Sequence, residues 1–339
     1  MTAKVNVGLI GAGRIGRVHA KNLAYRIPEA NLVAVADVFL EAAEKCAADF
    51  QISSVSQDPQ AVLKNKDVDA VIICSSTNTH AQFISDAAKA GKHIFCEKPI
   101  ALDLQTIDQA LADVDASGVK LQLGFNRRFD PNFKQARDMV AAGKIGKPHI
   151  VHIIARDPAP PPIEYIKVSG GIFLDQTIHD FDMARFLIDS EVEEIYAIGG
   201  VMVDPAIGEA GDIDTALITL RYANGAIGMI DNSRRSVYGY DQRVEVFGSE
   251  GSVVVGNSMP HTAVLSNVES IQSAKPLYFF LERYMDAYAA EMKVFIDCIL
   301  QDTPPPVTGI DGRIPVMMGL AAWKSYRENR PIKLNEIGP

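Results

Sequence analysis

The sequence has no excess of positive charge and no long apolar run. Its 339 residues include 33 lysines and arginines against 42 aspartates and glutamates, a formal net charge of −9. This balance disfavours binding to nucleic acid or to an anionic membrane surface. No apolar run reaches the ~18 residues that a membrane span needs. The first apolar strand pattern begins close to Met1, so we expect no signal peptide and a cytoplasmic protein.

Cysteines are few and are not arranged in pairs. The four are Cys46, Cys74, Cys96 and Cys298, and none of them forms a CxxC motif. Cys74 and Cys96 lie inside apolar strand patterns, as buried free thiols in a reducing compartment do. No histidine, cysteine or carboxylate cluster has a familiar zinc spacing, so we predict no metal site.

The N-terminal region contains a glycine-rich turn in a specific context. An apolar strand, Val5–Ile10, leads into the turn, a helical pattern follows, and a second strand, Leu32–Ala36, ends in Asp37. This order of strand, glycine turn, helix, strand and acid is the dinucleotide-binding fingerprint. The glycines allow a tight turn, close approach of a pyrophosphate and close helix packing, and free N–H groups at the helix start meet the phosphate charge. The predicted contacts are Gly11, Gly13, Arg14, Ile15 and Gly16.

Asp37 indicates which dinucleotide binds. A carboxylate at the end of the second strand accepts hydrogen bonds from the adenosine ribose hydroxyls and repels a 2′-phosphate. No arginine follows in the next four residues, Val38-Phe39-Leu40-Glu41, to neutralise that repulsion. The sequence therefore predicts NAD as the cofactor.

The pattern along the chain predicts two domains. Strands and helices alternate over residues 1–123, which is typical of a doubly wound parallel sheet, the Rossmann fold. Beyond that, a proline-rich segment at 157–162 and a helix over 172–188 precede several strands separated by turns such as Asn224-Gly225. We therefore expect an α/β fold class: an NAD-binding Rossmann domain at 1–123, and at 124–339 an α+β domain with a large open mixed or antiparallel sheet.

Polar residues follow two strands of the predicted parallel sheet, at the edge where ligands bind in such folds. The segment after the strand Ala70–Cys74 offers hydroxyl, amide and imidazole groups to a ribose or phosphate, although small polar residues there also suit a helix N-cap. Glu97 and Lys98 follow the strand at 93–97, where an ammonium group stabilises negative charge developing on a substrate oxygen. Lysines at strand ends are also commonly solvated. The predicted cofactor contacts here are Ser75, Thr77, Asn78, His80, Glu97 and Lys98.

A third cluster lies at the start of the helix predicted over 172–188. Asp175 and His179 are four residues apart, so in a continuous helix both side chains emerge on one face. A histidine beside a carboxylate is a general acid or base near neutral pH, which alcohol oxidation requires. The same spacing is also common in surface pairs and helix caps.

Together these motifs resemble the glucose–fructose oxidoreductase and inositol dehydrogenase family. GAGRIG, Asp37, CEKP at 96–99 and the Asp175–His179 segment carry the general resemblance. The later segments GFNRRFD (124–130), RDPAPPP (156–162), GGIFLDQTIHDFDMARF (170–186) and YGYDQRVEVFGSEG (238–251) are most similar to the inositol dehydrogenase branch, and the resemblance extends over nearly the whole chain.

The resemblance implies NAD-dependent oxidation of a ring hydroxyl of myo-inositol to 2-keto-myo-inositol, scyllo-inosose. It also implies a homotetramer in which the open face of the second sheet is buried. In that family the catalytic residues correspond to Lys98, Asp175 and His179. Further substrate contacts correspond to Arg127, Asp157 and Tyr240. Inositol dehydrogenases carry an amide where this chain has Asp157, which leaves the preferred isomer open.

Two alternatives accompany this expectation. The chain could oxidise another inositol isomer, polyol or sugar, since close relatives share parts of the same motifs. A regulator that binds NAD and a sugar without turnover is a different class of function. Such regulators typically lack the lysine or the histidine, and this chain has Lys98, Asp175 and His179.

Overall fold

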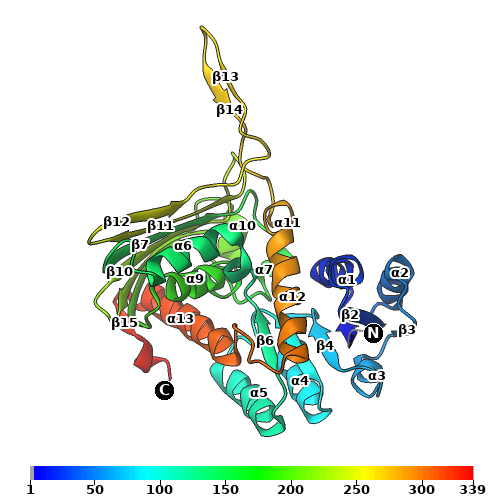
Figure 1. The fold of residues 1–339 in the computed structure, drawn as a ribbon. Helices are drawn as coiled ribbons and strands as arrows, with labels where there is room; N and C mark the ends of the chain where they lie inside the picture. Colours follow the sequence, from blue (N-terminus) through cyan, green and yellow to red (C-terminus); the bar gives the residue numbers. More distant parts are fainter. Residues whose placement is uncertain (1–3, 339) are drawn as a thin grey trace. The chain divides into compact units, whose positions relative to one another are not determined.

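The computed structural model describes residues 4–338. The chain forms two compact units, shown with the course of the chain in Figure 1. The first unit contains the residues up to Phe129 and the segment Asp286–Val316, and the second contains Asp130–Met285 and the residues from Met317 onward. The sequence analysis places a single boundary between residues 123 and 124, so it does not anticipate that a late segment returns to the first unit.

The first unit contains a six-stranded parallel sheet with the strand order β3-β2-β1-β4-β5-β6. This is the order of a Rossmann fold, whose switch point lies between β1 and β4. The strands are β1 (Val5–Ile10), β2 (Ala30–Ala36), β3 (Ser54–Ser56), β4 (Ala70–Ile73), β5 (His93–Glu97) and β6 (Leu121–Gly124). The helices of this region are α1 (Arg14–Arg26), α2 (Leu40–Phe50), α3 (Pro59–Leu63), α4 (Thr77–Lys89), α5 (Leu104–Ser117) and the 3₁₀ turn η1 (Asn126–Phe129).

The returning segment completes the core of the first unit. Helix α12 (Met285–Leu300) places Met292, Phe295 and Ile296 in one buried cluster with residues of β1. Phe295 lies against Phe95 of β5, with ring centroids 6.0 Å apart. Burying an aromatic side chain stabilises a fold by roughly 1.5–3 kcal/mol. The apolar face of α12 therefore accounts for its place in this unit, but a helical pattern alone does not say which sheet the helix covers.

The second unit is built on a seven-stranded sheet with the order β12-β11-β7-β10-β9-β8-β15. Only β7 and β10 pair in parallel, so the predicted mixed sheet is confirmed. Its strands are β7 (Pro148–Arg156), β8 (Val192–Gly200), β9 (Thr215–Tyr222), β10 (Ile227–Ser233), β11 (Asp241–Gly248), β12 (Gly251–Val255) and β15 (Ile332–Lys333). Its helices are α6 (Pro131–Ala141), α7 (Ile163–Ile166), α8 (Ile172–Asp175), α9 (Ile178–Ile188), α10 (Pro205–Glu209), α11 (Phe280–Arg283) and the end of α13 (Gly309–Glu328), followed by η2 (Leu334–Glu336).

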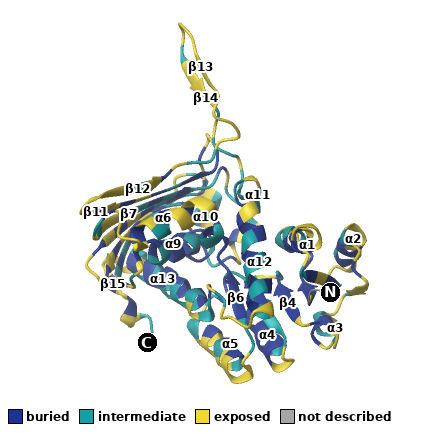
Figure 2. Cartoon of the chain, viewed as in Figure 1, coloured by how far each residue is buried: buried dark blue, intermediate teal, exposed yellow. Residues whose placement is uncertain are grey.

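One face of this sheet is covered and the other is open. Helices α6, α9 and α13 cover the first face (Figure 1), and Tyr222 of β9 donates a hydrogen bond to the Ala184 carbonyl of α9 at 3.2 Å. Side chains alternate along β9: Ile218 and Leu220 are buried, whereas Leu217 is exposed. Figure 2 shows the contrast between buried and exposed positions in the sheet. A half-covered sheet with this alternation is what the sequence pattern predicts.

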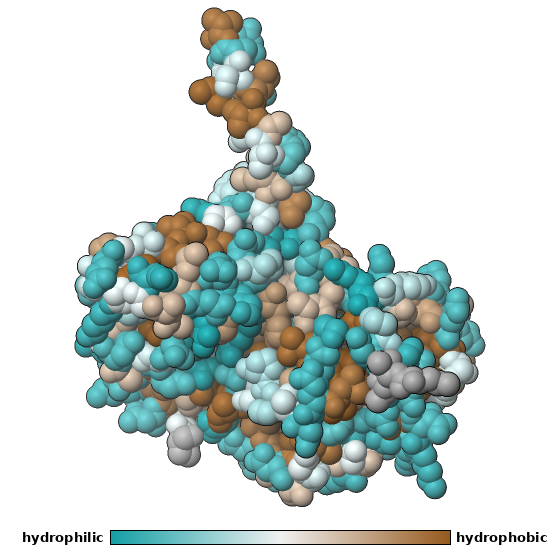
Figure 3. All heavy atoms as spheres, in the orientation of Figure 1, coloured by the Kyte–Doolittle hydropathy of each residue, from teal (hydrophilic) through white to brown (hydrophobic). Residues whose placement is uncertain are grey.

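A hairpin, β13 (Val264–Ser266) with β14 (Ile271–Ser273), extends away from the seven-stranded sheet (Figure 1). Hydrophobic residues gather along it in Figure 3, including the exposed Val264, Leu265, Val268 and Ile271. The sequence pattern does not predict this hairpin. Among residues 4–338, no helix has the length and apolar character that crossing a membrane requires.

Candidate active site

The glycine turn lies at the carboxyl end of β1. Gly11 has φ +97°, and a Cβ atom there would lie 2.5 Å from the carbonyl oxygen of Cys74. A Cβ at Gly16 would lie 1.9 Å from the carbonyl oxygen of Gly11, so side chains are excluded at both positions. At Gly13, in contrast, no described atom lies within 4 Å of the Cβ position. This open space beside the first residues of α1, Arg14 and Ile15, suits a pyrophosphate group.

Asp37 joins this turn to the end of β2. Its Oδ2 atom accepts a hydrogen bond from the Ala12 N–H at 2.7 Å, and its Oδ1 atom accepts one from the Phe39 N–H at 2.9 Å. The side chain is half-buried. Because a carboxylate offers about four acceptor positions, Asp37 can hold the turn and still accept ribose hydroxyls. The residues of the first unit therefore fit NAD.

The segment after β4 forms the start of a helix. Helix α4 begins at Thr77, so the predicted contacts Thr77, Asn78 and His80 lie in its first turns. The hydroxyl groups of Ser75 and Thr79 lie 2.7 Å apart, and Thr79 also donates to the Ser76 carbonyl. Small polar residues thus lie at the helix start, but the N-cap residue Ser76 makes no side-chain capping hydrogen bond.

His80 connects this helix to the end of β5. Its Nδ1 lies 2.8 Å from the carbonyl oxygen of Pro99, and its Nε2 lies 3.0 Å from that of Ser75. Burial lowers the pKa of His80 below its ordinary value, against the opposing effect of the two carbonyl groups. Both ring nitrogens face backbone oxygens, so the imidazole connects the loop after β4 to the loop after β5.

Glu97, Lys98 and Arg127 lie at the carboxyl ends of β5 and β6. The peptide bond between Lys98 and Pro99 is cis, and Lys98 is half-buried. The Oε1 atom of Glu97 lies 2.6 Å from Nε2 of His19 in α1. Arg127 is buried in η1, directly after β6. The first unit thus gathers the predicted cofactor residues at one edge of its sheet, which is where such folds bind ligands.

In the second unit, Asp175 and His179 do not share a continuous helix. The prediction of one helix over 172–188 is wrong, because α8 ends at Asp175 and α9 begins at Ile178. Two buried side chains explain the break. Gln176 donates to the carbonyl oxygens of Ala155 and Ser233, and Thr177 donates to Asn232 Oδ1 at 2.6 Å. These hydrogen bonds fix the half-buried Asp175 and His179 over the ends of β7 and β10.

Asp175 is held by two side chains that the sequence analysis did not select. The Tyr165 hydroxyl donates to its Oδ1 atom at 2.9 Å, and Arg234 donates to its Oδ2 atom at 3.1 Å. Arg234 is fully buried and also bonds Asp212 at 3.3 Å. Burial alone would lower the pKa of Arg234, but the charges of Asp175 and Asp212 outweigh it and raise the pKa. The sequence gives no periodic signal for such an arginine, because it lies outside any helix or strand.

Asp157 lies close to the same arginine. It follows β7 directly, its N–H donates to the Ser233 carbonyl at 2.9 Å, and its own carbonyl accepts from the Ser236 N–H at 2.6 Å. Its charge also raises the pKa of Arg234. The parallel pairing of β7 and β10 therefore brings Asp157 near Arg234, the buried cation that also bonds Asp175 of α8.

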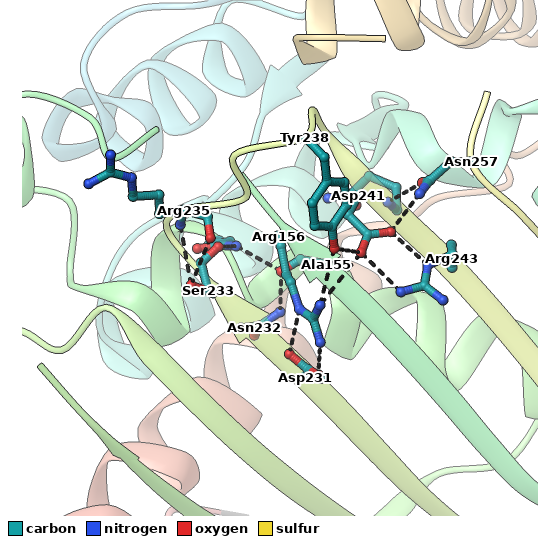
Figure 4. A network of polar contacts seen from close by, with 12 residues as sticks. Ala155, Arg156, Asp231, Asn232, Ser233, Arg235, Tyr238, Asp241, Arg243 and Asn257 are labelled. Carbon is teal, nitrogen blue, oxygen red and sulfur yellow. Dashed lines mark hydrogen bonds and ion pairs between the residues drawn. The ribbon is translucent and has the colours of Figure 1, made fainter. Parts of the chain in front are cut away.

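Tyr240 is positioned by its neighbours in sequence. Its ring is nearly buried and packs edge-on against Tyr284 at 6.0 Å. Figure 4 shows the polar network beside it: Tyr238 and Asn257 donate to opposite oxygens of Asp241, each at 2.6 Å. Burial raises the pKa of Asp241, but Arg243 and these two hydrogen bonds lower it more, so the carboxyl group stays ionised. The network fixes the chain on both sides of Tyr240.

Two family descriptions match the two parts of the chain. Residues 5–125 match "Oxidoreductase family, NAD-binding Rossmann fold", and residues 133–254 match "GFO/IDH/MocA C-terminal domain". The first match agrees with the glycine turn and Asp37, and both confirm the predicted fold class.

Similar proteins cover the chain from end to end. It is 49% identical to the myo-inositol 2-dehydrogenase of Thermotoga maritima, over 98% of this chain and 99% of the relative. It is 40% identical to the scyllo-inositol 2-dehydrogenase (NAD(+)) of Bacillus subtilis, over 99% and 98% of the two chains. The solved myo-inositol dehydrogenase of Lactobacillus casei, in complex with NAD(H) and myo-inositol, is 28% identical with a TM-score of 0.87, over 97% of this chain and 96% of that one. The chain belongs to the GFO/IDH/MocA family of oxidoreductases and has that family's NAD-binding Rossmann domain.

Proposed function

We propose that this chain is an NAD-dependent inositol 2-dehydrogenase that oxidises a ring hydroxyl of myo-inositol to 2-keto-myo-inositol, scyllo-inosose. The observation that carries the proposal is the 49% identity to a myo-inositol 2-dehydrogenase over 98% of the chain. The residues expected for the chemistry are all present: Lys98 after β5, and Asp175 and His179 at the break between α8 and α9. The cytoplasmic location expected from the sequence remains a prediction.

The proposed roles follow from the chemistry of each side chain. NAD, when bound, supplies the hydride acceptor. His179 removes the proton from the hydroxyl group, and Asp175 orients the imidazole and stabilises its cation. Lys98 donates a hydrogen bond to the same oxygen and stabilises its developing negative charge. Tyr165 and Arg234 hold Asp175 in place through hydrogen bonds to its two carboxylate oxygens.

Substrate recognition in this proposal uses charged and polar side chains. Inositol is a neutral, rigid ring of hydroxyl groups, so bidentate and charge-assisted hydrogen bonds suit it. Arg127, Asp157 and Tyr240 are the proposed contacts in addition to Lys98, Asp175 and His179. Asp157 offers only acceptors when ionised, whereas an amide offers both donors and acceptors, so this position bears on which hydroxyl orientation is preferred.

Scyllo-inositol is the second candidate substrate, because a scyllo-inositol 2-dehydrogenase is 40% identical over nearly the full length. The deciding experiment measures NADH formation by absorbance with myo-, scyllo- and chiro-inositol and with glucose. The proposal expects the highest kcat/KM for myo-inositol. A higher value for scyllo-inositol would support the second candidate, and turnover of glucose alone would point to a sugar dehydrogenase.

We also propose that the protein is a homotetramer joined through the open face of the seven-stranded sheet. Apolar side chains lie exposed on that face, among them Ile198 of β8, Leu217 of β9, Ile227 of β10 and Phe247 of β11. Ile198 and Leu217 are direct cross-strand partners, as are Phe247 and Ile150. Exposed apolar side chains paired across neighbouring strands favour a protein partner over water.

A further inference from the structure

The first unit contains a buried glutamate that none of the proposed steps uses. Glu291, in α12, has no exposed surface, and neither of its carboxylate oxygens has a hydrogen-bond partner among the described residues. An isolated carboxylate in such surroundings is strongly destabilising when ionised. A buried ionisable group is retained only where a neighbour compensates its charge or where the group is neutral.

Two neighbouring side chains define the pocket around Glu291. A nitrogen of His19, an oxygen of Glu97 and an oxygen of Glu291 all lie within 4.8 Å of one another. His19 is fully buried in α1, and its ring packs edge-on against Phe95 at 5.1 Å and Tyr288 at 5.7 Å. The imidazole is therefore fixed, and it holds Glu97 through the 2.6 Å contact.

The backbone of β6 closes the other side of the pocket. Gly124 pairs with Glu97 in the sheet, and a Cβ atom at Gly124 would lie 2.9 Å from Glu97 Oε2. Gln122 of the same strand donates to the main-chain carbonyl of Glu291 at 2.9 Å, which fixes α12 to the strand. The two glutamates are thus brought together by rigid elements and not by mobile side chains.

The charges in the pocket do not balance if both glutamates are ionised. The titratable groups near Glu291 are His19 of α1, Glu97 of β5 and Cys74 after β4, and Cys96 of β5 lies near Glu97. Burial and the charge of Glu97 raise the pKa of Glu291 well above its ordinary value. Burial and the charges of both glutamates raise the pKa of Cys74, and burial and the charge of Glu97 raise the pKa of Cys96. Both thiols therefore stay neutral. Two carboxylate oxygens within 4.8 Å of one another, one of them on a fully buried side chain, disfavour a state in which both groups are charged.

We propose that Glu291 is protonated and donates a hydrogen bond to Glu97, so that the two carboxyl groups share one proton and hold the end of β5 beside Lys98. This inference deepens the proposed function, on which the role of Lys98 rests. Glu97 is then held from two directions, by His19 of the helix that follows the glycine turn and by Glu291 of α12. Glu291 is a positioning residue that acts on Lys98 through Glu97.

The first test compares the stability of the wild type with that of Glu291→Gln, whose amide keeps a donor to Glu97 without a charge. A carboxyl group whose pKa is raised in the folded state stabilises the fold at a pH below the pKa of the unfolded state. That contribution to the free energy of unfolding is lost as the pH rises. We expect the wild-type folding constant to fall relative to the variant, by up to about tenfold per pH unit above pH 5. Glu44→Gln, at an exposed position of α2, is the matched control and should show no such trend. If the folding constant of the wild type relative to Glu291→Gln did not decrease as the pH rises, the proposal would be overturned.

The second test observes the proton directly by infrared spectroscopy. The wild type at pH 7 should show the carbonyl band of a buried protonated carboxylic acid, with a shift in deuterium oxide, and Glu291→Gln should lack it. An identical spectrum for the variant would contradict the proposal. The proposal would also be contradicted if one equivalent of zinc stayed bound to the wild type after dialysis and was absent from the variant. His19, Glu97 and Glu291 would then be metal ligands.

The third test separates positioning from mere stability. Glu291→Ala removes the donor, so kcat with myo-inositol should fall at least about tenfold, whereas Glu291→Gln should restore most of it. Equal losses in both variants would show that a charged Glu291 is required and would overturn the inference. If no inositol is turned over by the wild type, the proposed function fails, but the infrared and stability results still decide the protonation of Glu291, since they need no substrate.

Discussion

At the scale of single residues, the proposed chemistry depends most on His179. Replacing it with alanine should lower kcat with myo-inositol by about 10²–10⁴, because the general base is lost. NAD binding, measured by fluorescence titration, should stay within about twofold, since the residue belongs to the second unit and the cofactor residues belong to the first. A variant that kept the wild-type kcat at neutral pH would exclude His179 as the base.

The pH dependence provides an independent check of the same residue. A general base must be unprotonated to act, and histidine has an ordinary pKa of about 6.5. The rate should therefore fall as the pH drops through the range in which an imidazole becomes charged. Steady-state rates from pH 5 to 9 measure this, and a profile that is flat from acid to neutral pH would argue against an imidazole base.

Asp37 carries a prediction about the cofactor. Its carboxylate lies at the end of β2 and bonds the glycine turn through Ala12. Asp37→Ala should lower kcat/KM for NAD by about 10–100-fold, the effect of losing charge-assisted hydrogen bonds to ribose, and should raise the efficiency with NADP relative to NAD. Glu41→Gln, at an exposed position in the first turn of α2, is the control. Wild-type enzyme that used both cofactors equally well would disprove this role of Asp37.

At the scale of elements, the break between α8 and α9 depends on buried hydrogen bonds. Thr177→Val removes the hydroxyl that donates to Asn232 and leaves that amide oxygen buried, which should cost about 1–3 kcal/mol of unfolding free energy. Urea denaturation measures this loss. Thr262→Val, at an exposed loop position of the same unit, should change the stability little. Equal stability of the two variants would mean that the hydrogen bond does not hold the break.

The network around Asp241 predicts a loss of stability that depends on pH. The folded pKa of Asp241 is held below its ordinary value by Arg243, Tyr238 and Asn257, so its contribution is present at neutral pH and is lost as the pH falls below about 4. Asp241→Asn should be destabilised by roughly 2 kcal/mol at pH 7, and the difference from wild type should shrink on acidification. Glu245→Gln, exposed on the same strand, serves as the control. A difference that grows at low pH would contradict the assigned charge state.

The elements that the sequence predicts well are those whose signal is local. The pattern placed one strand at Val5–Ile10 and a second strand ending at Ala36, as β1 and β2 have them. The signals of the glycine turn and of Asp37 are equally local. The turn depends on space around its backbone, and the role of Asp37 depends on its place at the end of a strand. The fold class follows from such signals together.

What the sequence could not predict depends on contacts between distant residues. The 172–188 segment has a helical pattern throughout, yet Gln176 and Thr177 are drawn out of it by partners on β7 and β10. Arg234 holds Asp175 from a turn with no periodic signal. The return of α12 to the first unit is likewise decided by its packing on the first sheet. Sequence spacing therefore selected Asp175 and His179 as candidates but not the groups that position them.

At the scale of the whole molecule, the open sheet face predicts the assembly. Leu217 lies on that face, 42% exposed, and pairs with Ile198, which is 46% exposed. A charge at Leu217 would be buried in any interface formed there, and an unpaired buried charge strongly weakens association. Leu217→Glu should therefore shift the protein from tetramers to smaller species in size-exclusion chromatography with light scattering.

The matched control places the same charge in the first unit. Ile310→Glu lies at the start of α13, where the native side chain is 52% exposed, and it should leave the mass unchanged. If Leu217→Glu remained tetrameric, or if the wild type were monomeric, the open face would not be the interface. Because Asp175 and His179 lie in α8 and α9 at the ends of β7 and β10, away from the open face, a dissociated variant should still turn over inositol. Loss of activity together with dissociation would instead mean that assembly supports the site, through the segments that carry Asp157 and Tyr240 at the edge of the same sheet.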